Sequence, residues 1–158
     1  MDILVYAIKM ELDGEKYYLE QARLNKDNSL CTIFLDLAKE ESNHARILEN
    51  KSKGLFYQLN APVKANIQNI FDKIKDFKID TKSNPEQVDA YKMAMLKEKE
   101  SIDLYKKLLN ETAECAELYN YLISQEEEHY ALFEEILKIA NRPNEWVEAA
   151  EFGNREEY

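Results

Sequence analysis

Apolar residues recur at helical spacing in four long segments of this 158-residue chain. The segments run from about 2 to 25, 29 to 53, 86 to 109 and 112 to 140. In each of them an apolar position returns every three or four residues, which is the period of an amphipathic α-helix. The pattern therefore predicts four long helices, each with one face in a common core.

Residues that favour turns separate these helices. The polar segment 25–29 predicts a turn, Gly54 is predicted to end the second helix, and Pro85 is well placed to begin the third. Residues 141–143, which include a proline, are predicted to end the fourth helix. The apolar residues within 144–152 then predict one short extra helix at the C-terminal end.

The connection between the second and third helices is long. It covers 54–85, and its apolar pattern predicts a shorter amphipathic helix after Pro62. Four helices with one long crossover in the middle predict an all-α, ferritin-like four-helix bundle. We expect a single domain over 1–158, with the bundle at about 2–141 and a C-terminal extension over 142–158.

Composition and charge remove several classes of partner. A formal net charge of −10 argues against nucleic acid, because no basic surface remains to neutralise phosphates. No apolar run is long enough to cross a bilayer, and the first residues do not form a signal-type segment, so we expect a cytoplasmic protein without a membrane partner. With only two cysteines, Cys31 and Cys115, the chain cannot build a four-cysteine metal site.

A glutamate interrupts the apolar stripe of every predicted helix. In chain order these glutamates are Glu11, Glu41, Glu98 and Glu126. The two histidines of the chain, His44 and His129, each follow one of them by three residues. Residues at i and i+3 share a helix face, so each Glu–His pair can point at a common spot. Glu40, Glu127 and Glu128 are predicted to lie off this face.

The two halves of the chain follow the same plan. Glu11 and Tyr18 are seven residues apart, as are Glu98 and Tyr105, and the Glu-x-x-His motif occurs once in each half. Two interpretations of the tyrosines stay open. They are core aromatics whose hydroxyls find a polar partner, or they hydrogen-bond a metal ligand or act as redox-active bystanders. Gly14 is a weak point in the first helix that a close approach of another group would explain.

Four buried carboxylates need compensating charge. Ionised together inside a bundle they are strongly unfavourable, whereas two divalent cations bring four carboxylates and two neutral imidazoles to about zero formal charge. One glutamate from each of two helices and Glu-x-x-His from each of the other two is the established arrangement of di-iron and di-manganese bundles. A single stripe glutamate is usually a helix-edge residue, but four in matching registers predict a dinuclear site.

The donor types narrow the metal and its chemistry. Carboxylate and imidazole donors without thiolate suit iron or manganese, and zinc can bind in vitro. Six side chains for two ions leave coordination positions open, which is the condition for chemistry with peroxide or dioxygen.

In these segments the chain resembles the rubrerythrin and ferritin-like di-iron superfamily. The resemblance covers about 2–141 and is carried by segments 10–18, 37–44, 98–105 and 122–129; segment 142–152 resembles the tails of stand-alone rubrerythrin-like proteins. It implies that Glu41 and Glu126 bridge two iron ions. Glu11 and His44 then complete one ion, and Glu98 and His129 complete the other.

The resemblance also implies a reaction. Rubrerythrins reduce hydrogen peroxide to water with two electrons from the reduced di-iron pair, which rubredoxin then re-reduces. Classical members carry a rubredoxin domain and an additional glutamate ligand three residues after the helix-three glutamate. This chain has no four-cysteine domain and has Ser101 at that position, so we expect an external electron donor.

Three other functions stay open. The six-residue ligand set is also that of bacterioferritins, which oxidise and store iron. A di-manganese catalase-like activity and a metal-binding bundle without catalysis are the remaining alternatives. A homodimer is expected, because long bundles often pair through a helix face.

Overall fold

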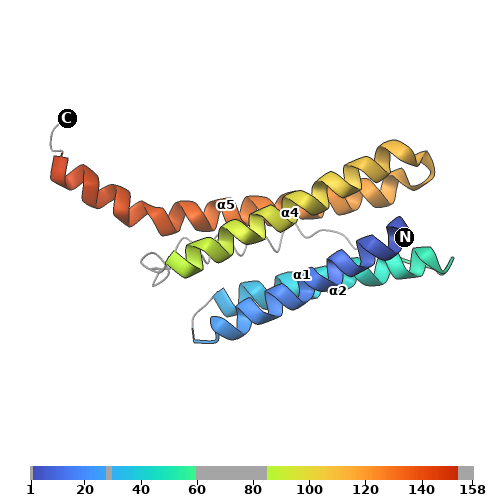
Figure 1. Cartoon of the computed structure of the whole chain (residues 1–158), viewed down its shortest axis with the longest axis horizontal. Coiled ribbons are helices and arrows are strands. Elements are labelled where there is room, and N and C mark those ends of the chain that lie inside the picture. Colours follow the sequence, from blue (N-terminus) through green and yellow to red (C-terminus); the bar gives the residue numbers. More distant parts are fainter. Residues whose placement is uncertain (1, 28–29, 60–84, 153–158) are drawn as a thin grey trace.

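The computed structural model describes residues 2–27, 30–59 and 85–152, with the backbone alone for 85–86 and 139–152. Within these residues the structure is all α-helical and contains no strand, so the predicted ferritin-like bundle is confirmed (Figure 1). The elements are α1 (Ile3–Leu24), α2 (Leu30–Ser52), α4 (Pro85–Glu111), a 3-10 turn η2 (Ala113–Cys115) and α5 (Ala116–Phe152). The predicted crossover helix after Pro62 falls in 60–84, outside the described residues.

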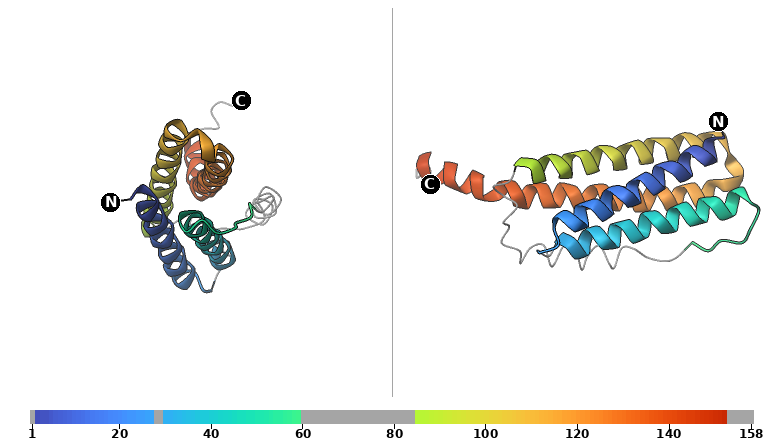
Figure 2. Two further views of the ribbon diagram at one scale, coloured as in Figure 1. Left: turned by 90° about the vertical axis from the view of Figure 1, so that its right-hand side faces the viewer. Right: turned by 60° about the horizontal axis from the view of Figure 1, so that its bottom comes forward.

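The bundle consists of two helical hairpins. α1 packs along α2 and α4 packs along α5, whereas α1 and α4 meet at only a few points (Figures 1 and 2). The apolar stripes of all four helices nevertheless pack together, in two clusters that span both hairpins. The wider separation between hairpins leaves room for long polar side chains.

The ends of the first hairpin follow local capping chemistry. Asp2 caps α1, because its Oδ1 accepts a hydrogen bond from the Leu4 N–H at 3.0 Å. Gly54 ends α2 as predicted. Its φ of 70° lets its own N–H donate to the Lys51 carbonyl at 3.1 Å while the Leu55 N–H donates to the Asn50 carbonyl at 2.8 Å. These two bonds form a Schellman cap.

The predicted end of the fourth helix at 141–143 is wrong. α5 continues through Pro143 to Phe152 as one helix, so the separate short C-terminal helix does not exist. Proline in a helix removes one backbone hydrogen bond and costs about 3 kcal/mol. The residues after it, 144–152, are mainly strong helix formers such as glutamate and alanine, so the helix resumes in the same element.

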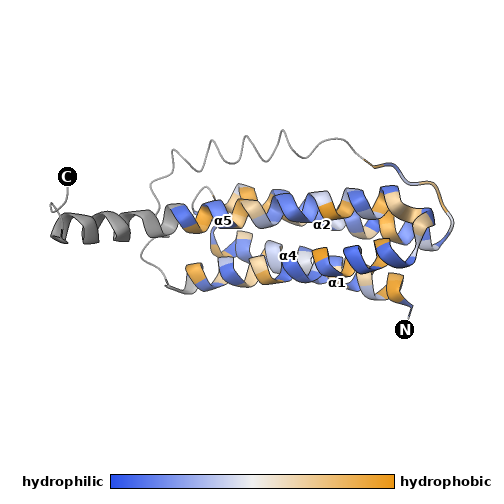
Figure 3. Ribbon diagram, turned by 90° about the horizontal axis from the view of Figure 1, so that it is seen from above, coloured by the Kyte–Doolittle hydropathy of each residue, from blue (hydrophilic) through white to orange (hydrophobic). Residues whose placement is uncertain are grey.

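Two hydrophobic clusters fill the described part of the bundle, where apolar and polar residues alternate around each helix (Figure 3). The aromatic cluster is built around four stacked rings: Tyr18, Phe34, Tyr91 and Phe133. The other cluster, which we call the aliphatic cluster, surrounds the stacked Tyr105 and Tyr119 with mainly aliphatic side chains, four of them leucines: Leu48, Leu108, Leu118 and Leu122. Among the described residues, no helix combines the length and apolar character that a membrane span requires.

Candidate metal centre

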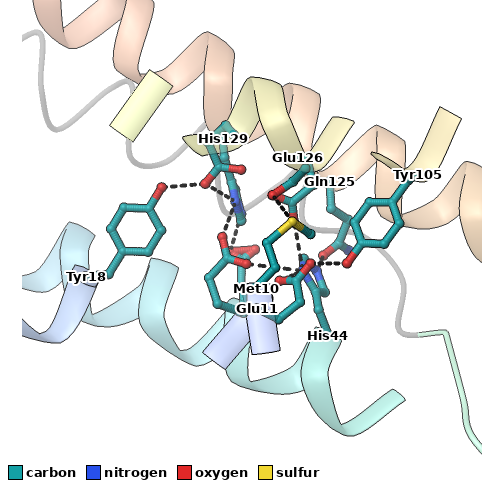
Figure 4. Close-up of polar contacts among 12 residues, drawn as sticks. Met10, Glu11, Tyr18, His44, Tyr105, Gln125, Glu126 and His129 are labelled. Atoms are coloured by element: carbon teal, nitrogen blue, oxygen red, sulfur yellow. Dashed lines mark hydrogen bonds and ion pairs between the residues drawn. The ribbon is translucent and has the colours of Figure 1, made fainter. Parts of the chain in front are cut away.

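All six residues predicted for the site are buried and come together between the hairpins. They are Glu11 from α1, Glu41 and His44 from α2, Glu98 from α4, and Glu126 and His129 from α5. The labelled members, Glu11, His44, Glu126 and His129, point toward one another in Figure 4. The helix periodicity therefore identified inward positions correctly in all four helices.

The six residues form two overlapping groups. One contains Glu11, Glu41, His44 and Glu126, and the other contains Glu41, Glu98, Glu126 and His129; within each, one ligand atom per residue lies within 4.8 Å of the others. Glu41 and Glu126 belong to both groups. We call Glu11 with His44 the His44 half, and Glu98 with His129 the His129 half. The two shared glutamates lie between the halves.

Both imidazoles turn the same ring nitrogen toward the carboxylates. His44 Nδ1 lies 2.9 Å from Glu126 Oε1 and 3.3 Å from Glu11 Oε1. His129 Nδ1 lies 3.4 Å from both Glu41 Oε1 and Glu98 Oε1. Each histidine thus presents a single nitrogen to the site and leaves Nε2 for a partner behind the ring.

Those partners were not identified from the sequence. His44 Nε2 contacts Gln125 Oε1, and His129 Nε2 lies 3.4 Å from Glu40 Oε2. Glu40 was predicted to lie off the inward face, yet its side chain is only 20% exposed and reaches His129. One feature of the sequence could have identified them: Glu40 and Gln125 directly precede the two shared glutamates. Glu127, by contrast, is exposed as predicted and lies 3.8 Å from Lys106 Nζ.

The hydroxyls of the two tyrosines in the repeated pattern each donate a hydrogen bond to a glutamate of the opposite hairpin. Tyr18 of α1 donates to Glu98 of α4, and Tyr105 of α4 donates to Glu11 of α1. Both rings are core residues, and both hydroxyls also orient a candidate ligand, so the packing and hydrogen-bonding interpretations of the tyrosines hold together.

Several buried polar atoms of the site make no hydrogen bond of acceptable geometry within the described part of the chain, although some lie within ion-pair distance of a neighbour. They are both carboxylate oxygens of Glu126, Oε2 of Glu98 and Nδ1 of His129. Buried oxygen and nitrogen atoms without partners are costly unless another group satisfies them. Oxygen and imidazole donors in this arrangement fit two divalent cations of the iron or manganese type.

The electrostatics of the metal-free protein also indicate a site that lacks positive charge. Burial, followed by repulsion from Glu11, raises the pKa of Glu41 well above its usual value, and burial with repulsion from Glu41 does the same for Glu126. Burial also opposes ionisation of Glu98, but the charge of His129 and hydrogen bonds lower its pKa to about 2. Although burial disfavours the charged form of His129, the nearby carboxylates raise its pKa well above normal. Protons therefore take the place that cations would occupy.

An open groove of about 730 Å³ leads to the site between α1 and α4. Tyr18, Glu41 and Glu98 line its inner end, and Gly14 lies beside them. A Cβ atom on Gly14 would be 3.5 Å from Glu41 Cδ, so this glycine is where α1 comes close to the shared carboxylate, as expected. The groove thus reaches the His129 half of the site.

Ser101 also lines this groove, but its hydroxyl does not bond the carboxylates of the site. Its hydroxyl donates to the Lys97 carbonyl at 3.1 Å and lies 3.6 Å from Met10 Sδ. The position at which the additional glutamate ligand is expected is therefore occupied by a short side chain that is hydrogen-bonded to its own helix.

The fold and the buried clusters define a ferritin-like helical bundle whose carboxylate and histidine groups are compatible with two metal ions. The family model described as Rubrerythrin matches residues 2–137, and the chain belongs to the rubrerythrin family. No curated protein and no solved structure matched the chain.

Proposed function

We propose that this protein is a di-iron carboxylate oxidoreductase that reduces hydrogen peroxide with electrons from a separate donor protein. The observation that carries the proposal is the pair of overlapping buried groups that share Glu41 and Glu126 and open to solvent through one groove. Family membership supports the same assignment.

The proposed ligand roles follow from the two groups. Glu11 and His44 Nδ1 would hold one ion, Glu98 and His129 Nδ1 would hold the other, and Glu41 and Glu126, which belong to both groups, would be shared between them. Two reduced iron ions bound there would supply the two electrons for reduction of hydrogen peroxide, which takes up two protons as its O–O bond breaks and gives two water molecules.

The protein contributes orientation and access. The hydroxyl of Tyr18 donates to one carboxylate oxygen of Glu98, and that of Tyr105 donates to one carboxylate oxygen of Glu11. These hydrogen bonds fix the orientation of both carboxylates and leave the second oxygen of each available to a metal ion. The groove between α1 and α4 admits a small molecule beside Gly14, and the short Ser101 side chain leaves the approach to Glu98 free. A separate iron–sulfur protein such as rubredoxin is the electron donor that we propose, and the rubrerythrin family supports it.

Iron oxidation and storage is the second candidate, and Ser101 is the observation that favours it. With serine at this position the candidate ligand set is limited to six side chains, which is the bacterioferritin set. Storage requires a large shell, whereas the peroxidase needs only a small oligomer, for which we propose a homodimer.

One set of measurements separates these functions. Metal analysis and size-exclusion chromatography of the purified protein should give a small oligomer with about two irons per chain. The iron-loaded protein should consume peroxide when rubredoxin and a rubredoxin reductase are supplied. Uptake of many irons per chain into a large shell would establish storage instead. Retained manganese with peroxide dismutation in the absence of reductant would establish a catalase, and two bound ions with no turnover would leave a binding protein.

Two neighbouring glutamates provide a matched control for the site. Glu126→Ala should abolish metal loading and peroxide consumption, because Glu126 belongs to both groups. Glu127→Ala, which removes the same chemical group from an exposed position one residue away, should leave both unchanged. Equal loss in the two variants would contradict the assigned site.

A further inference from the structure

The two histidines of the site are supported from behind by different chemical groups. Gln125 Oε1 contacts Nε2 of His44, and Glu40 Oε2 lies 3.4 Å from Nε2 of His129. Gln125 precedes Glu126 on α5, and Glu40 precedes Glu41 on α2. The contacts are therefore equivalent under the internal repeat of the chain, but one partner is a neutral amide and the other a carboxylate.

The position of the ring proton connects these partners to the metal ions. Nδ1 of each imidazole faces the carboxylates of the site, so a neutral ring that binds through Nδ1 carries its proton on Nε2. The His129 Nε2–H then donates to a carboxylate, and the His44 Nε2–H donates to an amide. A charge-assisted hydrogen bond is roughly twice as strong as a neutral one, and a carboxylate behind a ligating histidine makes that histidine more basic.

The surroundings of Glu40 strengthen this contact. His129 is completely buried, and the Glu40 side chain is only 20% exposed, so bulk water screens the pair weakly. Among the ion pairs of the described residues, Glu40 has no partner other than His129, and its second carboxylate oxygen is buried without a hydrogen bond. A half-buried acidic group held in this way directs its charge at the imidazole.

We infer that Glu40 is a positioning residue that makes the two metal positions unequal. The His129 half binds its ion more tightly and stabilises its higher oxidation state more strongly than the His44 half, which Gln125 supports. This inference rests on the proposed two-ion site, and it assigns a difference between positions that the repeated ligand set alone would make equivalent.

Exchange of the two supporting residues tests the inference without catalysis as a readout. The metal-free protein is titrated with Co²⁺, followed by visible absorption and calorimetry, and we expect two resolved binding steps. Glu40→Gln should weaken the tighter step by about 10- to 100-fold, the usual effect of losing a carboxylate behind a ligating histidine. Gln125→Glu should strengthen the weaker step, and the double exchange should restore two steps.

Assignment of each step uses variants that retain one histidine. His44→Ala should keep the tighter step, and His129→Ala should keep the weaker one. In the double exchange E40Q/Q125E this order should reverse. Reduction potentials of the iron-loaded proteins should follow the same order, with the more negative potential moving from the His129 half to the His44 half.

Controls keep the outcomes distinct. Glu127→Gln makes the same change of charge at an exposed site and should leave both steps unchanged. Circular dichroism checks that each variant is folded, and Gln125→Glu provides a gain-of-affinity result that unfolding cannot imitate. If the wild-type protein binds fewer than two ions, the proposed function and this inference both fail. If it binds two ions and neither exchange alters either step, only the inference fails.

Discussion

The His44 half and the His129 half of the site contain the same donors in different surroundings. Tyr105 belongs to the mainly aliphatic cluster and bonds Glu11 of the His44 half, whereas Tyr18 belongs to the aromatic cluster and bonds Glu98 of the His129 half. Tyr18 stacks on Phe133 with ring centroids 5.9 Å apart and an interplanar angle of 12°.

The difference shows which parts of the repeat are constrained. A glutamate and a Glu-x-x-His motif must recur in each hairpin for two groups to share Glu41 and Glu126. The core around each tyrosine and the support behind each histidine are free to diverge, and only the His129 half borders the groove. A symmetric ligand set therefore permits two chemically different metal positions.

Removal of a shared glutamate should eliminate both halves together and has the largest expected effect. Glu41→Ala should reduce the iron content after loading from about two ions per chain to nearly none, while Glu11→Ala should leave about one. The reason is that Glu41 occurs in both groups and Glu11 in one. Metal analysis by mass spectrometry measures this, and equal iron content in the two variants would refute the shared role.

The pH dependence of stability tests a property that both halves share, which is the raised pKa of several of their carboxylates and imidazoles. In the metal-free protein the pKa values of Glu41, Glu126, His44 and His129 are all raised. The folded state then holds these protons more tightly than the unfolded chain. The contribution of these groups to the free energy of unfolding is fully present below their pKa values in the unfolded chain. It is lost as pH rises through their pKa values in the folded protein.

Metal binding responds in the opposite direction, because the ligands must lose those protons. The stabilisation by bound metal should therefore increase from about pH 6 to pH 8 by about 1.4 kcal/mol per pH unit for each proton released, and the difference in melting temperature between loaded and metal-free protein should widen accordingly. Scanning calorimetry at several pH values measures this. A constant difference would show that no proton leaves the site on binding.

Loss of a tyrosine hydroxyl should weaken one half selectively. Tyr18→Phe leaves Glu98 without its donor and should lower metal affinity in the His129 half by about tenfold or more. Tyr105→Phe should do the same through Glu11 in the His44 half. Metal titration measures each effect.

Tyr17 provides the control for these substitutions. Its hydroxyl donates a hydrogen bond of 2.7 Å to the Ala90 carbonyl and not to a candidate ligand. Tyr17→Phe should leave metal affinity unchanged. A comparable loss in this variant would mean that the hydroxyls act on the packing of α1 against α4 and not on the ligands.

Obstruction of the groove should have the smallest effect, on rate alone. Gly14→Leu should slow azide binding to the iron-loaded protein by about tenfold, equivalent to about 1.4 kcal/mol in the barrier, with unchanged metal content. Gly14→Ala should be tolerated, because the added Cβ would be in ordinary contact with Glu41 at 3.5 Å. Stopped-flow absorption measures the rates. Unchanged binding in Gly14→Leu would require another route to the site.

The helices and the convergence of the six residues could be predicted because each depends on periodicity within one segment. Positions such as Glu41 and His44 share a face by local geometry alone. The partners of His129 and Tyr18 could not be predicted in this way. Glu40 and Glu98 reach them from the opposite hairpin, and the register between hairpins is set by packing. The continuation of α5 past Pro143 differs from the prediction because the helix formers that follow the proline outweigh its unfavourable effect.

The unequal packing within and between hairpins also has a consequence for how the chain folds. Contacts between α1 and α2, or between α4 and α5, close short loops and can form early and independently. Union of the hairpins must bring Tyr18 to Glu98 across 80 residues of sequence and Tyr105 to Glu11 across 94. That late step buries the acidic residues together, so the rate at which the hairpins dock should depend on whether metal is present during refolding.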